Sequence, residues 1–186
     1  MQMKISKNVL TLTGAILASA LANAQAQPAK APAPARAASP VTGPQANLGQ
    51  LMKGIFYSNS NVIFGAQDQN PADMAPAKDP STSPNPLTST YGKWEAVENS
   101  GLAIAEAASL LNVPGRKCAN GRAVPIRNAD WSKFVQGVRE AGLKAYAAAK
   151  AKDQEKILDV TDVLATACAS CHDKYREKPN LADRCQ

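Results

Sequence analysis

The chain has 186 residues, of which 45% are hydrophobic and 19% charged, so it can bury the core of one ordinary domain but not of two large ones. The formal net charge of +6 arises mainly near the N-terminus, because residues 45–186 hold 17 basic and 15 acidic residues. No basic stripe with interleaved aromatic residues is present in the sequence. Nucleic acid is therefore excluded as an expected partner.

The first 24 residues have the three parts of a secretory signal peptide. Lys4 and Lys7 precede an apolar run from Val9 to Leu21, and Ala22-Asn23-Ala24 supplies small residues for cleavage. The apolar run is shorter than the roughly 20 residues that a membrane-spanning helix needs, and no later run is longer. We expect residues 1–24 to be removed and the mature protein to be periplasmic, without a transmembrane segment.

Residues 25–44 are rich in alanine and proline and have no apolar face, which is typical of a disordered or semi-extended linker. Residues 45–186 should form the folded domain. Apolar residues recur at threes and fours between 47 and 64, which predicts the first helix. Residues 66–90 should form a long surface loop, because they contain prolines at positions 71, 76, 80, 84 and 86.

Three more helices are expected. The second runs over 91–112, capped by Thr90, and the third over 129–151, capped by Asn128. The last begins after Asp153, a favourable N-cap, and ends at Pro179. No segment alternates like a strand, so the pattern predicts an all-α, antiparallel four-helix bundle.

The last predicted helix contains Cys168-Ala169-Ser170-Cys171-His172, the C-x-x-C-H sequence of covalent c-type haem attachment. On a helix the two sulfurs face the same side, where each can join a vinyl group of the porphyrin. The next residue, histidine, then reaches the iron. Export agrees with this hypothesis, because c-type haem is attached outside the cytoplasm.

Three other interpretations of this sequence remain open but are less favoured. A thioredoxin-like redox site would place its two cysteines at the start of a helix that follows a strand. A zinc site would need a fourth ligand and the awkward use of adjacent Cys171 and His172. Plain core residues would not explain why the single histidine of the chain follows the cysteine pair directly.

If His172 binds the iron, no second histidine remains for bis-histidine coordination, for a Ser-His-Asp triad or for a three-histidine metal site, because it is the only histidine of the chain. In an up-down-up-down bundle, Met52 near the start of the first helix lies level with His172, so it is the expected distal ligand. Met74 lies in the loop at the opposite end, some 30 Å away on helices of about 20 residues. The alternative for Met52 is a flexible residue that fills the core.

A C-x-x-C-H sequence near the end of the last helix of a small exported helical chain resembles the class II c-type cytochromes, the cytochrome c-prime and cytochrome c556 group. The resemblance covers about residues 47–178 and implies one haem near the C-terminal end of the last helix. Met52 stands where c556-type members have a methionine ligand. Arg176 resembles a basic residue that c-prime members keep, although a cation in the last turn also favours the helix dipole.

Cys118 and Cys185 should lie at the same end of the bundle as the haem motif. An oxidising compartment permits a disulfide between them, which would close a loop of 67 residues and stabilise the fold by about 4 kcal/mol. Two unpaired thiols are the alternative.

These observations favour an exported monohaem cytochrome that transfers single electrons to and from a redox partner protein. Cys168 and Cys171 would tether the haem, and His172 and Met52 would bind its iron. The alternative is a five-coordinate, c-prime-like protein that binds nitric oxide or carbon monoxide, with Phe56 walling the open face. No paired carboxylates or spare histidine suggest an enzyme, and the resemblance leaves a homodimer open.

Overall fold

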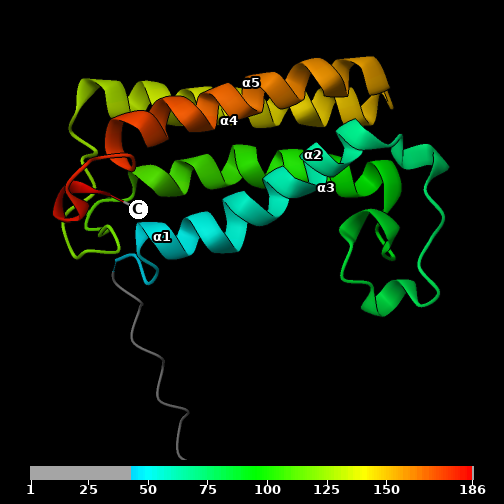
Figure 1. Cartoon of the computed structure of the whole chain (residues 1–186), viewed down its shortest axis with the longest axis horizontal. Helices are drawn as coiled ribbons and strands as arrows, with labels where there is room; N and C mark the ends of the chain where they lie inside the picture. The colour runs from blue at the N-terminus through cyan, green and yellow to red at the C-terminus, as the bar shows by residue number, and fades with distance from the viewer. Residues whose placement is uncertain (1–42, 186) are drawn as a thin grey trace, which may run out of the picture. The chain divides into compact units, whose positions relative to one another are not determined.

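The structure, a computed structural model, describes residues 43–185. The expected signal peptide and nearly all of the expected linker lie outside these residues. In the described part, four helical segments pack against one another, and their directions alternate along the bundle (Figure 1). This confirms the expected all-α arrangement of four helices.

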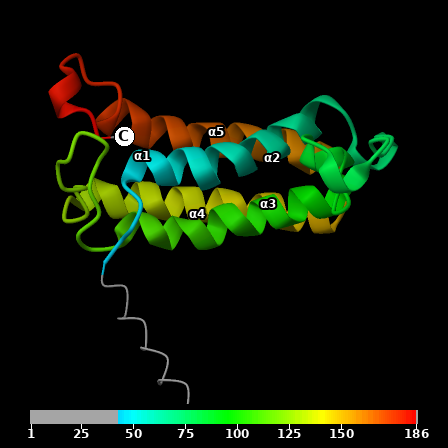
Figure 2. The same cartoon turned by 90° about the horizontal axis from the view of Figure 1, so that it is seen from below.

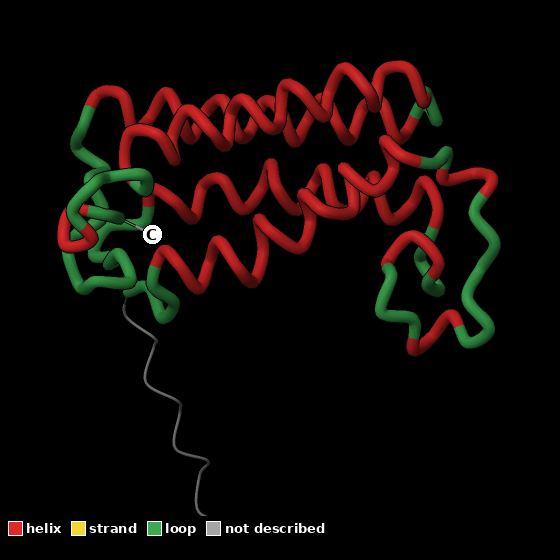
Figure 3. Tube along the Cα trace, viewed as in Figure 1, coloured by secondary structure: helices red, strands yellow, loops and turns green. Residues whose placement is uncertain are grey.

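The four segments are built from regular helix and shorter turns of other types (Figure 3). The first contains α1, a π-helical segment η1, and α2; the second contains α3 and a 3₁₀ segment η5. Their bounds are Leu48–Leu51 for α1, Met52–Tyr57 for η1, Ser58–Asp68 for α2, Lys93–Ala107 for α3, Ala108–Asn112 for η5, Ala129–Lys150 for α4 and Gln154–Tyr175 for α5.

The helix caps match the expected ones only in part. Asp153 caps α5 as expected, and its side chain accepts a hydrogen bond from the amide of Lys156. The expectation for Thr90 is wrong, because α3 starts later and its N-cap is Gly92. A Cβ at Gly92 would lie 2.6 Å from the Leu87 carbonyl oxygen, so the chain turns tightly there before the helix begins.

The C-terminal limit of α5 also differs from the prediction. The helix ends at Tyr175, before Pro179. The amides of Arg176 and Glu177 both donate to the carbonyl of His172, which closes the last turn. The helix therefore stops just after the C-x-x-C-H sequence, and the chain turns back from there.

Proline-initiated turns organise the segment that follows α2. The 3₁₀ segments η2 (Pro71–Asp73), η3 (Pro80–Thr82) and η4 (Pro86–Thr88) each begin with a proline, and the side chain of the preceding Asn70, Asp79 or Asn85 caps each one. Pro71 and Leu87 are buried. The expected surface loop is thus partly anchored to the core, and η4 packs on α3.

The closest helix pair is formed by α3 and α4, which lie side by side in Figure 2. A Cβ added at Gly101 would lie 2.6 Å from the Tyr146 amide nitrogen, and one at Gly142 would lie 2.7 Å from the Ala105 nitrogen. Ala141 and Ala145 are fully buried beside them. Small residues therefore let the two backbones touch along this seam, which we call the α3–α4 seam.

A disulfide joins Cys118, in the connection between η5 and α4, to Cys185 at the end of the described chain, with a Cα–Cα distance of 4.9 Å. This confirms the expected pair. Its neighbourhood is reinforced by Asn120, whose side-chain amide donates to the carbonyls of Ala182 and Arg184. The C-terminal segment, which includes η6 (Leu181–Asp183), is thereby held against the long connection.

Within residues 43–185, no helix is both long enough and apolar enough to cross a membrane.

Candidate functional site

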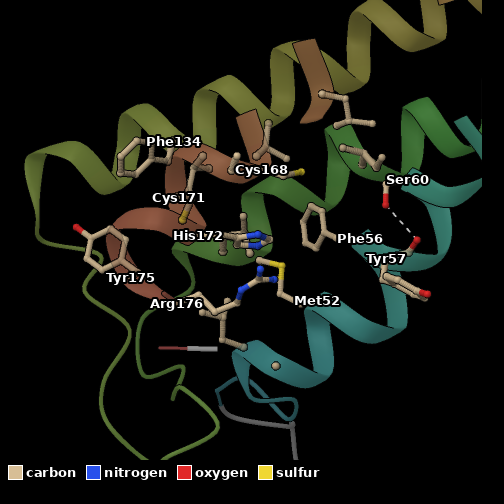
Figure 4. Close-up of a pocket in the computed structure, with 18 of the residues that line it drawn as sticks. Met52, Phe56, Tyr57, Ser60, Phe134, Cys168, Cys171, His172, Tyr175 and Arg176 are labelled. Atoms are coloured by element: carbon tan, nitrogen blue, oxygen red, sulfur yellow. Dashed lines mark hydrogen bonds between the residues drawn. The ribbon is translucent and has the colours of Figure 1, made fainter. Parts of the chain in front are cut away.

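A cavity of about 660 Å³ opens between the first helical segment and α5. Its walls are mainly apolar and come from all four helical segments, with Ala119 and Cys185 added from the segments joined by the disulfide. The volume falls within the roughly 300–1,000 Å³ typical of sites for cofactor-sized ligands. Figure 4 shows the side chains that project into it.

The C-x-x-C-H sequence contributes all three of its chemically active residues to this cavity. Cys168, Cys171 and His172 lie on the last turns of α5, and each lines the cavity (Figure 4). Both cysteines are unpaired and half-buried. The structure therefore presents two free thiols and one imidazole to the same apolar space.

Met52 lines the same cavity from the opposite element, η1, as its level in the bundle predicts. Figure 4 shows Met52 near His172, with Phe56 beside them. Met74 lies elsewhere, buried in the core just after η2. Of the two methionines, only Met52 belongs to this site.

The π-helical segment explains how the first segment covers so much of the cavity. Leu48, Met52, Phe56, Ser60 and Phe64 all line it, at intervals of four residues. In a regular α-helix of 3.6 residues per turn, each such step rotates the side chain by about 40°, so the first and last would face different ways. The wider turn of the π-helical segment η1 partly reverses this rotation, so the five side chains stay closer to one face.

Burial sets the protonation of the three motif residues. It raises the pKa of the Cys171 thiol to about 11, with neighbouring Cys168 and Asp130 adding to the effect, and it raises the pKa of Cys168 as well. Burial lowers the pKa of His172, and the Arg176 guanidinium lowers it further. At neutral pH the site thus presents two thiols and a neutral imidazole.

Arg176 lines the cavity next to His172, as its position four residues later predicts. Its guanidinium Nε pairs with the Glu177 carboxylate, and both side chains are partly exposed. The pair lies directly after α5, where the amides of both residues bond to the His172 carbonyl. The cation is therefore positioned at the rim of the cavity.

A polar contact between α4 and α5 holds the end of the motif helix in place. The Tyr175 hydroxyl donates to the Asp130 carboxylate at 2.6 Å and accepts from the Asn128 side-chain amide at 3.1 Å. Lys174 lies 3.7 Å from the same carboxylate. Asn128 precedes α4 as expected, but its side chain makes this contact and does not cap the helix.

Two aromatic residues of α4 pack edge-on against Tyr175, namely Trp131 and Phe134. Trp131 lines the cavity, is 1% exposed, and its Nε1 has no acceptor within residues 43–185. An unsatisfied buried donor of this kind costs about 1–3 kcal/mol.

Sequence patterns did not reveal the contributions of Ser60, Phe64 and the Tyr175–Asp130 contact. The spacing of four from Met52 through Phe56 to Phe64 is the signal that could have shown the first two. Nothing local relates Asp130 to Tyr175, which is 45 residues away.

The residues present fit a covalently bound haem. Two thiols three residues apart on one helix face, a neutral imidazole and a methionine line an apolar cavity of suitable volume. A bare metal site fits less well, since no group of three histidine, cysteine or acidic side chains in residues 43–185 is placed to hold an ion. Raised thiol pKa values also differ from the lowered ones of thioredoxin-like sites.

Comparison of the whole chain with protein-family models, with curated proteins and with solved structures gives no match.

Proposed function

We propose that the chain is an exported monohaem c-type cytochrome that carries single electrons, similar in plan to the class II c-type cytochromes. The convergence of Cys168, Cys171, His172 and Met52 on one apolar cavity carries this proposal. Met52 lies more than 100 residues before the other three in the sequence. A chance core arrangement would not require two free thiols beside the only histidine.

The cysteines would hold the group. Each sulfur would form one thioether bond to the edge of the porphyrin. Both side chains project from the same face of α5. Two bonds to one helix would fix the plane of the group relative to that helix.

His172 would bind the iron through a neutral imidazole, the form required of a metal ligand. The bound haem supplies a one-electron couple between ferric and ferrous iron. Met52, which lines the cavity from η1, would be the second protein ligand of the iron. Methionine opposite histidine raises the reduction potential.

We assign no enzymatic role to the chain. Asp130, whose charge acts on Cys171, already accepts a hydrogen bond from Tyr175 and lies near Lys174, so its pKa is lowered and it remains a weak base. An electron carrier needs only a bound redox cofactor and a surface that its partner protein can approach. The Cys118–Cys185 disulfide agrees with an oxidising, extracytoplasmic location.

The test uses the full chain exported from a host that matures c-type haem. We expect pigmented protein whose colour stays with the polypeptide after extraction with acidified acetone. Replacement of both Cys168 and Cys171 by alanine should remove covalent colour, whereas the Cys118→Ala variant should retain it. Colourless wild-type protein, or pigment that extracts completely, would contradict the proposal.

The ligand opposite His172 is tested by the visible spectrum. The ferric wild-type protein should be low-spin, Met52→Ala should be high-spin and bind carbon monoxide when reduced, and Met74→Ala should resemble the wild type. The observation that favours the gas-binding alternative is the room in the cavity beside Phe56. High-spin ferric wild-type protein that takes up carbon monoxide rapidly on reduction would establish that alternative and overturn Met52 ligation.

A further inference from the structure

Charged side chains are divided unequally between the two halves of the bundle. One half, residues 43–57, 103–139 and 165–185, carries the haem motif and Met52; the other comprises residues 58–102 and 140–164. The first half holds 11 basic and 5 acidic residues, and the second holds 6 basic and 10 acidic. The first half therefore has a surplus of six positive charges and the second a surplus of four negative charges. Because these largely cancel, the net charge of the domain does not reveal the division.

Many of the positive charges in the first half, which we call the basic half, are not neutralised by a neighbour. Within residues 43–185, no carboxylate lies within ion-pair distance of six of its cations. They are Lys53, Lys117, Arg127, Lys133, Lys178 and Arg184.

Two cations of the basic half line the cavity itself, one of them without an ion-pair partner in residues 43–185 and one paired with Glu177. Lys53 is exposed on η1 and lines the cavity directly after Met52, and Arg176 lines it from the end of α5. The two propionates of a haem would leave the basic half with a surplus of about four positive charges. The potential is therefore positive where an electron would enter or leave.

We infer that the basic half of the bundle is the docking surface for an acidic protein that exchanges electrons with this chain; the inference rests on the proposed function. Complementary charge speeds encounter and orients the two proteins before contact. An acidic partner repels the negative surplus of the opposite half and attracts the basic half. The chain therefore approaches with its cavity towards the partner. Rim charges of this kind act over about 8 Å at physiological ionic strength.

The surface fits a protein better than a lipid membrane. Asp130, Asp173, Glu177 and Asp183 lie among the cations of the basic half and would be repelled by anionic headgroups. Interspersed carboxylates instead give a protein partner a defined register.

The first experiment measures the local charge at the site of electron exchange. The reduced, pigmented protein is mixed in a stopped-flow apparatus with hexacyanoferrate(III), a trivalent anion, or with tris(phenanthroline)cobalt(III), a trivalent cation. Each reagent accepts one electron and transfers no atom. Raising the ionic strength from about 10 to 200 mM should slow the anion reaction by about fivefold and accelerate the cation reaction.

Charge-reversed variants locate the effect. Lys53→Glu and Lys133→Glu change the basic half, and Lys144→Glu makes the same change in net charge on an exposed position of the other half. At low salt each of the first two should slow the anion reaction about threefold, and the third should leave it nearly unchanged. Lys133 does not line the cavity, so it keeps the test valid if Lys53→Glu disturbs Met52. Equal effects of all three variants would overturn the inference.

Competition identifies the class of partner. Poly-L-glutamate, as a mimic of an acidic protein surface, should slow hexacyanoferrate(III) reduction by the wild type and less so by Lys133→Glu. Inhibition by phosphatidylglycerol vesicles but not by poly-L-glutamate would overturn the inference in favour of a membrane. A pigmented, redox-active protein that fails these tests leaves the proposed function intact, whereas a colourless protein overturns both.

Discussion

The bundle joins helices in two contrasting ways. Along the α3–α4 seam, Gly101 and Gly142 bring the backbones into contact, and no space remains for even one added carbon. Between η1 and α5, the same fold leaves a cavity of about 660 Å³ lined by larger side chains such as Phe56. The contrast shows that close backbone packing in one part of the bundle coexists with a cavity in another, and this cavity is where we propose that the haem is bound.

The largest effect should follow from filling the seam. Gly142→Val places side-chain atoms against the Ala105 nitrogen and the Gly101 carbonyl oxygen, which are backbone atoms and cannot rotate away. We expect the free energy of unfolding to fall by at least about 4 kcal/mol, above the usual range for overpacking. Urea unfolding followed by far-ultraviolet circular dichroism measures it.

The matched control lies on the cavity side. Gly54, in η1, has nothing within 4 Å of an added Cβ. Gly54→Ala should leave the stability unchanged or raise it by up to about 1 kcal/mol, because alanine has less freedom in the unfolded chain. A Gly142→Val protein as stable as Gly54→Ala would contradict the close approach of α3 and α4.

A smaller loss is expected when the disulfide beside the cavity is removed. The Cys118→Ala/Cys185→Ala protein loses a link across 67 residues, and its free energy of unfolding should fall by about 4 kcal/mol or somewhat less. Cys185→Ala alone should have nearly the same effect, since either change breaks the bond. If peptide mapping without reductant finds both thiols free in the wild type, the bond is absent.

The smallest effect should appear as a pH dependence at the contact between α4 and α5. The hydrogen bond from Tyr175 is the main reason why the pKa of Asp130 is lowered, and Lys174 lowers it further. A carboxyl whose pKa is lower in the folded state adds stability above its unfolded pKa, about 3.9. That stability disappears as the pH falls through the lower, folded value.

Tyr175→Phe should therefore be less stable than the wild type near pH 7, and the difference in unfolding temperature should shrink below about pH 4. It should also shrink above about pH 10, because the pKa of Tyr175 is raised by burial and by Asp130. Tyr146→Phe is the control, since the Tyr146 hydroxyl has no hydrogen-bond partner within residues 43–185. A difference that stays constant with pH would exclude the Asp130 hydrogen bond as its cause.

The sequence predicts the features that depend on periodicity and chain order. Apolar spacing locates the four helical segments, and alternation of direction brings Met52, His172, Cys118 and Cys185 to one end of the bundle. These inferences need no knowledge of individual contacts. The bond between Cys118 and Cys185 follows from the same reasoning.

Features decided by tertiary competition were not predictable. The Asn128 side chain bonds to Tyr175, 47 residues away, although its sequence position favours a helix cap. The π-helical turn at η1 contains residues that fit an α-helix equally well. It lies where η1 forms part of the cavity wall. Local sequence propensity depends only on neighbouring residues, so it predicts neither the contact between Asn128 and Tyr175 nor the π-helical turn.

The disulfide divides the four cysteines into one bonded pair and one pair of free thiols. Cys118 and Cys185 are joined in a disulfide, whereas the proposed haem attachment would require Cys168 and Cys171 to stay reduced until each binds the porphyrin. Four thiols can form two disulfides in three ways, and Cys171 is only 14 residues from Cys185. The order of the oxidation steps therefore matters in this proposal. A disulfide formed early by Cys168 or Cys171 would prevent that residue from binding the haem.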